Sequence, residues 1–274
     1  MHSSKFPFAV RLIGFEAPEF AEVCAALAQA PPPGPTYFCL LEDSLQEPDL
    51  YIVNGDHLPA LAALSGANST DITPALLIGA PAPAFPFPQL PRPLDPTRMH
   101  HLLAGLVHKR AQALAQLTAR GLSPVVIERR RKPRLDIDLT DPAQHEQKRK
   151  EPPSGAILIV DKGGAFRDHV AKVLGARRLP VEWTDSAWAA VRLCDETQVS
   201  VLMINTSTPQ VDPYRLCSDV KGLVACRTAV VFLVGRSFCY DAPRARAVGV
   251  RGLLDKPVAD RHLCAAINKL MSLP

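Results

Sequence analysis

The sequence predicts an α/β protein with two doubly wound parallel sheets, each of five strands, joined by a polar linker. Three observations lead to this prediction: short apolar runs alternate with segments of helical period, the alternation occurs twice, and a charged stretch separates the two series. Alternating strands and helices form right-handed β-α-β units whose sheet is covered on both faces. We expect domains over residues 1–120 and 155–274, with the linker over residues 121–154.

The second series is the clearer one. Residues 156–160 are wholly apolar, which is typical of a strand buried on both faces. Further strands are expected over residues 199–204, 229–234 and 252–254. The helical period is marked by apolar residues that share one face, first Phe166, Val170, Val173 and Leu174, and at the end of the chain Leu263, Ile267, Leu270 and Met271.

The first series repeats this pattern around many prolines. Of the 27 prolines, 16 lie before residue 97, and we expect proline-rich connections in place of a fourth helix. Residues 97–118 then keep a helical period and would span about 33 Å. This helix either packs on its own sheet or serves as a dimerisation or signalling helix, through which the chain would form a homodimer. The expected strands are residues 8–13, 37–41, 49–53 and 75–78.

Composition excludes several classes of protein. A net charge of +4 is too small to indicate a nucleic-acid partner. No run of 18 apolar residues predicts a membrane span, no secretion signal opens the chain, and we expect a cytoplasmic protein. The seven cysteines contain no C-x-x-C pair and are expected to be reduced. Because no nucleotide-binding loop, metalloprotease or hydrolase motif occurs, and His100, His101 and His108 lack further ligands, we expect neither an enzyme nor a metal site.

The residues that follow the strands of a parallel sheet are those that bind ligands and perform chemistry. In the second domain these include Asp161, Asn205 and Lys256, the last followed by a proline. This arrangement resembles the receiver domain of response regulators over residues 155–274, a flavodoxin-like (CheY-like) fold. In the first domain Arg92-Pro93 stands where the second has Lys256-Pro257, so we interpret the first domain as a repeat of the same fold.

The resemblance also implies that phosphorylation has been lost. Receiver domains carry a phosphoacceptor aspartate after the third strand, and by the resemblance this position holds Asn205 in the second domain and Asn54 in the first. An amide cannot form an acyl phosphate. The acidic pair expected to hold Mg²⁺ is reduced to Asp161-Lys162, and a divalent cation needs clustered oxygen ligands. We therefore interpret Asp161 and Lys256 as a vestigial pocket in which Lys256 hydrogen-bonds Asn205 or pairs with Asp161.

The linker contains a dense run of cations, five in the six residues from Arg129 to Arg134. On composition alone this is a solvated tether or a nonspecific nucleic-acid contact. The run and the Leu-Asp-Ile-Asp-Leu that follows it resemble the opening of PilZ domains, whose R-x-x-x-R motif binds cyclic di-GMP. The resemblance implies a dinucleotide contact by Arg130 and Arg134, with Arg129 flanking and Arg131 assisting. Guanidinium groups bond phosphate bidentately, stack on purines and pair with guanine.

Two functions are therefore consistent with the sequence. In the first, a phosphorylation-independent bacterial signalling protein binds cyclic di-GMP through its linker and relays the signal to a regulatory protein partner. In the second, the chain is a ligand-independent adaptor of a two-component pathway, and the linker is only a tether. A nucleic-acid contact is not expected, because neither a helix-turn-helix nor interleaved aromatic residues accompany the basic run.

Overall fold

The computed structural model describes residues 7–67, 69–80, 85–121, 155–175, 179–223 and 227–271. The chain divides into two compact units. The first contains Met1–Leu41 and Glu47–Val126, and the second contains Glu42–Gln46 and Ile127–Pro274. Each unit holds a five-stranded sheet whose strands are all parallel, which confirms the predicted α/β fold class.

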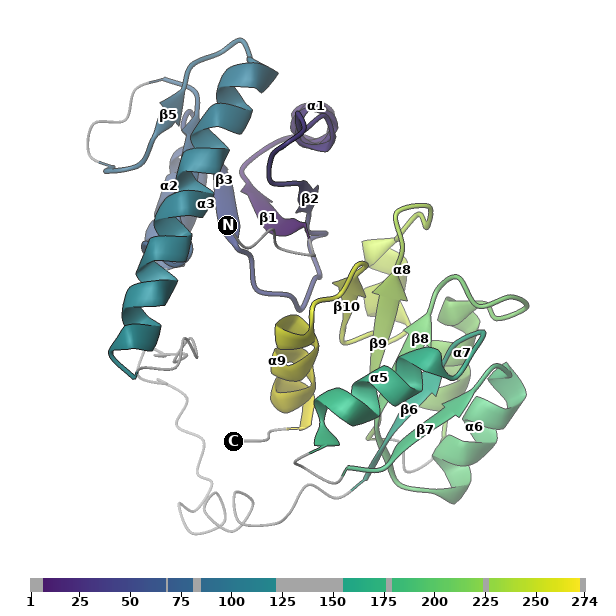
Figure 1. Ribbon diagram of the computed structural model, residues 1–274. Coiled ribbons are helices and arrows are strands. Elements are labelled where there is room, and N and C mark those ends of the chain that lie inside the picture. The colour runs from purple at the N-terminus through teal and green to yellow at the C-terminus, as the bar shows by residue number, and fades with distance from the viewer. Residues whose placement is uncertain are drawn as a thin grey trace, which may run out of the picture. The chain divides into compact units, whose positions relative to one another are not determined.

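The first sheet has the order β2-β1-β3-β4-β5, the flavodoxin-like order. In Figure 1 the strands of this sheet are purple to blue. The longest helix described in the first unit is α3. The elements of this unit are β1 (Phe8–Ile13), α1 (Ala17–Ala28), β2 (Tyr37–Cys39), β3 (Leu50–Asn54), α2 (Leu58–Gly66), β4 (Ala75–Ile78), β5 (Gln89–Leu90) and α3 (Pro96–Ala119).

Apolar side chains on both faces of the first sheet form its core. On one face α1 and α3 cover strand residues such as Val10, Ile52 and Ile78. On the other face α2 covers Val53 and Leu77. The helix residues buried in these two layers are Val23, Ala26 and Leu27 of α1, Met99, Leu103 and Leu106 of α3, and Ala60, Leu61 and Leu64 of α2.

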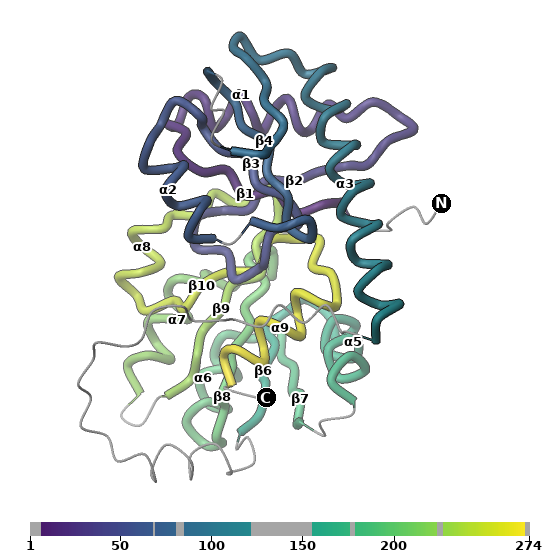
Figure 2. Tube along the Cα trace, turned by 90° about the vertical axis from the view of Figure 1, so that its left-hand side faces the viewer, coloured from purple at the N-terminus to yellow at the C-terminus, as the bar shows by residue number. Residues whose placement is uncertain are grey.

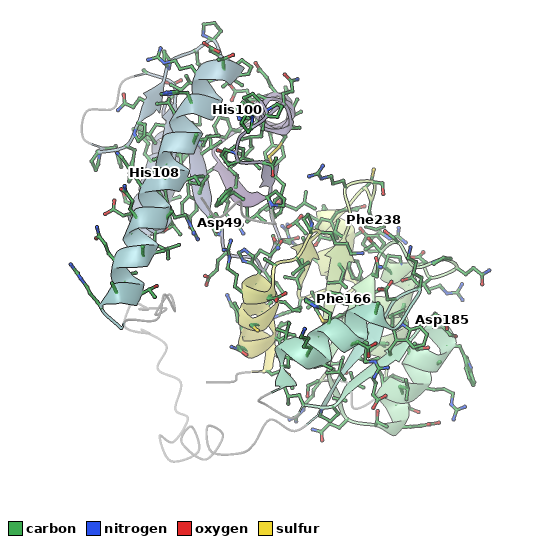
Figure 3. All side chains as sticks on the ribbon, in the orientation of Figure 1. Asp49, His100, His108, Phe166, Asp185 and Phe238 are labelled. Carbon is green, nitrogen blue, oxygen red and sulfur yellow. A yellow bond between two sulfur atoms is a disulfide. The ribbon has the colours of Figure 1, made fainter. Side chains whose placement is uncertain are left out.

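The predicted helix over residues 97–118 is confirmed as α3, which has 24 residues and is about 36 Å long. Asp95 caps it by accepting hydrogen bonds from the backbone N–H groups of Thr97 and Arg98. Its first half is buried on the sheet, as His100 illustrates, and it continues beyond His108 (Figure 3). Whether it joins two copies of the chain remains a prediction.

The cysteine prediction was wrong for one pair. Cys24 of α1 and Cys39 of β2 form a disulfide, with their Cα atoms 6.2 Å apart, inside the usual range for such bonds. The packing of α1 against β2 brings the two residues together, which a lone cysteine in each element does not reveal. Four other cysteines in the described residues are free thiols: Cys194, Cys217, Cys239 and Cys264.

The second sheet has the order β7-β6-β8-β9-β10. Counted within their own unit, these are strands two, one, three, four and five, which is the order of the first sheet. Figure 2 shows β6, β8 and β9 at the centre of this unit. The elements are β6 (Ala156–Val160), α5 (Ala165–Val173), β7 (Val181–Thr184), α6 (Ala187–Glu196), β8 (Val199–Asn205), α7 (Pro213–Lys221), β9 (Ala229–Val234), α8 (Ala242–Ala247), β10 (Gly252–Asp255) and α9 (Asp260–Met271).

The three central strands of the second sheet are apolar because helices cover both of their faces. Helices α5 and α9 pack on one face, where Val170 and Ile267 join a core with Ile159 and Met203. Side chains of the opposite sheet face are equally buried, among them Phe232. The helices on that side contribute the buried residues Ala190 of α6, Leu216, Cys217 and Val220 of α7, and Ala245 of α8.

The two units differ in their connections. The second unit has α6 between its second and third strands and α8 between its fourth and fifth. Between β2 and β3, residues 40–49 form no helix, and the described residues between β4 and β5 form none either. The described part of this second connection contains Pro86 and Pro88, which disfavour a helix there. In the part of the chain that is described, no helix is long and apolar enough to cross a membrane.

Candidate functional site

The candidate site of the second unit lies at the carboxyl ends of its strands. Asp161 follows β6, Asn205 ends β8 and Lys256 follows β10. The Asn205 amide donates from Nδ2 to Asp161 Oδ1 at 2.6 Å, and the Lys256 ammonium donates from Nζ to Asn205 Oδ1 at 2.5 Å. The topology thus joins three side chains, the outermost two of which are 95 residues apart in sequence, into one chain of hydrogen bonds.

Both ends of the Asn205 amide are in use. Its Oδ1 also accepts the backbone N–H of Ser207 at 3.0 Å, and Asp161 Oδ1 accepts the backbone N–H of Lys162 at 2.7 Å. Asn205 itself is only 5% exposed. Burial lowers the pKa of Lys256, against which the nearby Asp161 carboxylate acts to raise it. The site is therefore a compact polar network whose cation is already paired.

The first unit has an asparagine and a cation in matching places. Asn54 ends β3 opposite Ile78 of β4, and Ile78 lies opposite Leu90 of β5. Arg92 follows Leu90 by two residues and precedes Pro93 through a cis peptide bond. Its Nη2 donates to Asn54 Oδ1 at 3.2 Å, while Asn54 Nδ2 donates to the Gly14 carbonyl at 2.9 Å.

The second unit keeps the same register. Asn205 lies opposite Leu233 of β9, Leu233 lies opposite Leu254 of β10, and Lys256 follows two residues later, again before a cis proline. Asn54 therefore corresponds to Asn205, and Arg92 to Lys256. In both units a cation from the last strand end donates to the side-chain oxygen of the asparagine.

In the first site, unlike the second, the structure records carboxylates bonded directly to the cation. Asp56 accepts the backbone N–H of Ala80 at 2.8 Å through Oδ1, and Nε of Arg92 at 3.0 Å through Oδ2. These bonds, the backbone one first, hold the pKa of Asp56 below its usual value. Arg92 also pairs with Glu19 of α1 at 2.5 Å. A Cβ atom at Gly79 would lie 2.5 Å from the Asp56 carboxylate, so this close approach requires glycine there.

Comparison with known protein families finds a match within the second unit. Residues 157–268 match the family described as response regulator receiver domain. They form a receiver domain. No curated protein matches the chain.

Among solved structures, the chain is similar to a response regulator receiver domain protein from Clostridium thermocellum, at 21% identity over 43% of this chain and 95% of that one, with a TM-score of 0.39. It is also similar to the signal receiver domain of a histidine kinase from Syntrophus aciditrophicus, at 27% identity over 43% of this chain and 91% of that one, with a TM-score of 0.39. An adenylate cyclase from Rhodopirellula baltica is 20% identical over 44% of this chain and 89% of that one, with a TM-score of 0.40.

Within the receiver domain, the third strand, β8, ends at Asn205, and β9 ends at Val234, which has no hydroxyl group. Nearby hydroxyl groups bond to the backbone: Thr206 Oγ1 donates to the Leu233 carbonyl at 3.1 Å, and Thr208 Oγ1 donates to the Val160 carbonyl at 3.4 Å. Searched over the described residues, the chain contains no group of three or more His, Cys, Asp or Glu side chains that could hold a metal ion.

Sequence reasoning named Asn54, Asn205, Asp161 and Lys256, and the structure brings the last three together. It missed Asp56 and Glu19 as parts of the first site. The position of Arg92 before a proline, matching Lys256, was the signal that could have led to them. Arg129, Arg130, Arg131 and Arg134, the predicted cyclic di-GMP contacts, lie outside the described residues.

Proposed function

We propose that this chain is a phosphorylation-independent bacterial signalling protein that uses its receiver-type sheets as scaffolds for a regulatory protein partner. One observation carries the proposal. In each unit the residue at the end of the third strand is an asparagine, and its side-chain oxygen accepts a hydrogen bond from the cation of the last strand end. The chain would act by binding and not as an enzyme.

The chemistry of the site supports a loss of phosphorylation. An amide nitrogen cannot be displaced to form an acyl phosphate, so Asn54 and Asn205 are not phosphoacceptors. Lys162 places an ammonium directly after Asp161, where hard divalent cations would need another oxygen ligand. Both cations also have partners within their own unit, since Lys256 bonds Asn205 and Arg92 bonds Asp56 and Glu19.

This part of the proposal is tested by incubating the full chain with radiolabelled acetyl phosphate and Mg²⁺. We expect no acid-stable, hydroxylamine-sensitive label on the wild-type chain. A matched variant, Asn205→Asp with Lys162→Asp, restores an acceptor and an acidic pair, and label on it would show that the assay detects this scaffold. Stoichiometric label on the wild type would refute the proposal.

For the input signal we propose cyclic di-GMP, bound by the linker residues Arg129, Arg130, Arg131 and Arg134. The support is the order of the residues and the chemistry of guanidinium groups, which bond phosphate oxygens and guanine edges and stack on purines. Ligand binding at the linker would change the surface that the partner protein contacts.

Calorimetry separates this input from the ligand-independent adaptor. We expect saturable binding of cyclic di-GMP to the wild type, and its loss in Arg130→Ala with Arg134→Ala. The control is Lys148→Ala with Arg149→Ala, which removes the same charge from the same linker and should leave binding unchanged. Equal loss in both pairs would indicate a nonspecific charge effect, and no binding by the wild type would favour the adaptor.

A further inference from the structure

The second unit contains one short piece from far earlier in the chain. Glu42–Gln46, here called the edge segment, lies between β2 and β3 in sequence but belongs by its contacts to the second unit. It lies beside β10, the edge strand of the second sheet, where Ser44 forms a parallel bridge with Leu253. Strand β10 is labelled next to α8 and β9 in Figures 1 and 2.

The backbone contacts are those of an added strand. Leu45 N–H donates to the Leu253 carbonyl at 2.8 Å, and Leu253 N–H donates to the Asp43 carbonyl at 3.2 Å. Leu253 thus bonds to the residues on either side of Ser44, its partner in the bridge, which is the hydrogen-bond pattern of parallel strands. The edge segment therefore covers backbone groups that an edge strand otherwise offers to another chain.

Side chains of the second unit bind the Asp43 carboxylate. Tyr240 Oη donates to Asp43 Oδ2 at 3.0 Å, and Arg246 Nη2 of α8 donates to Asp43 Oδ1 at 2.8 Å. Burial, together with the hydrogen bond to Asp43, raises the pKa of Tyr240, so the hydroxyl stays protonated and can donate. Arg246 also pairs with Glu42 at 3.2 Å. The carboxylate is thus held by two donors, one on each oxygen.

Two further side chains of the edge segment have their own places on the second unit. Leu45 packs against the core cluster that lies under α9. Gln46 is 2% exposed, and its Oε1 accepts the backbone N–H of Asp255 at 2.8 Å. At Gly252 a Cβ atom would lie 2.7 Å from the Leu45 side chain, and φ is +157°, so glycine permits this approach.

We propose that the β10 edge is a binding site for an extended peptide of the pattern Asp-x-Leu-Gln, and that the edge segment occupies it within the chain. The site reads the acidic residue through Tyr240 and Arg246, the leucine through the apolar core, and the glutamine through the Asp255 amide. A partner segment of the same pattern binds when the edge segment is released. This inference does not depend on the nucleotide or on the loss of phosphorylation.

The test uses the full chain with Asp43→Ala and Gln46→Ala, which weakens the edge segment and leaves the site itself intact. Hydrogen exchange is measured at the Leu253 and Asp255 amides, where we expect a rise of about tenfold or more over the wild type. A labelled peptide of residues 41–47 is then added. The peptide should bind the variant and restore protection of these two amides. The wild type should not bind it at ~100 μM, because the tethered edge segment competes at an effective concentration on the order of millimolar.

Two controls define the recognition. A peptide with alanine in place of Asp43 should not bind the variant, and adding Arg246→Ala to the variant should abolish binding of the unaltered peptide. If the double variant is not folded under the conditions of the exchange experiment, the same measurements are made on the single variant Asp43→Ala. Exchange at the wild-type rate in both variants, or equal binding with and without Arg246, would overturn the proposal.

Discussion

The ion pair between Asp49 and Arg110 should be the most costly single polar interaction to break in the first unit. Asp49 is labelled in Figure 3, and its side chain is 1% exposed, while that of Arg110 is 11% exposed. Arg110 Nη2 donates to Asp49 Oδ1 at 2.7 Å, and the Ala9 N–H donates to Oδ2 at 2.9 Å. Arg110 Nε also donates to the Asp49 carbonyl at 3.3 Å. The pair thereby attaches α3 to the start of β3.

The magnitude follows from burial. Removing one partner of a buried pair leaves an ionised group with reduced compensation and costs about 3–5 kcal/mol. Because Asp49 keeps the hydrogen bond from Ala9, we expect the lower end, about 3 kcal/mol, for Arg110→Met, which retains an apolar stem. In a domain of this size that lowers Tm by roughly 10–20 °C.

The assay is thermal and urea unfolding of the full chain, with the transition of the first unit followed by hydrogen exchange of its strands, since two units need not unfold together. Asp49→Asn and the double variant complete a cycle, in which we expect a coupling of at least about 2 kcal/mol. Arg192→Met is the control, because Arg192 and Glu196 are 52% and 54% exposed and such pairs contribute about 0.5 kcal/mol. A loss below about 1 kcal/mol for Arg110→Met would refute the reasoning.

Three other predictions concern the first unit. The pKa of Asp56 is lower in the folded state, so its contribution to stability is present above about pH 4 and is lost as the pH falls through the folded pKa. Asp56→Asn should therefore make Tm fall less steeply with decreasing pH in the acid range. An unchanged slope would contradict this. Gly79→Ala forces the Asp56 side chain away, so its destabilisation in urea should add only in part to that of Asp56→Ala, which removes the clashing atoms; full additivity would disprove the contact. The disulfide joins Cys24 to Cys39, which are 15 residues apart in sequence, and its reduction should lower the free energy of unfolding by about 3 kcal/mol. Cys24→Ser should abolish the effect of a reductant on Tm, and an equal effect in that variant would place the disulfide elsewhere.

The sequence by itself determined the fold class and most of the strands. Apolar runs such as residues 156–160 and 229–234 became strands β6 and β9 because burial on both faces admits only apolar side chains. The period over residues 97–118 became α3. The positions of Asn205 and Lys256 at strand ends followed from the apolar runs over residues 199–204 and 252–254, since a parallel sheet gathers its carboxyl ends at one edge.

Two of the four strands at sheet edges, β5 and β7, were not expected from the sequence. Strand β7, Val181–Thr184, lies at the edge and has an exposed glutamate at its second position, so it has no continuous apolar run. Strand β5 has two residues, Gln89–Leu90, directly after Pro88. Its hydrogen bonds to β4, rather than any local propensity, make it a strand.

Only the tertiary structure decided which distant residues meet. Asp56 engages Ala80 and Arg92 because the ends of β3, β4 and β5 are neighbours, and Cys24 reaches Cys39 because α1 packs on β2. The edge segment is the strongest case. Its five residues show no apolar alternation of their own, and they become an added strand because β10 leaves backbone donors and acceptors at the edge, with Tyr240 and Arg246 placed to bind Asp43. Local pattern encodes burial, whereas pairing across long separations depends on the free energy of the assembled unit.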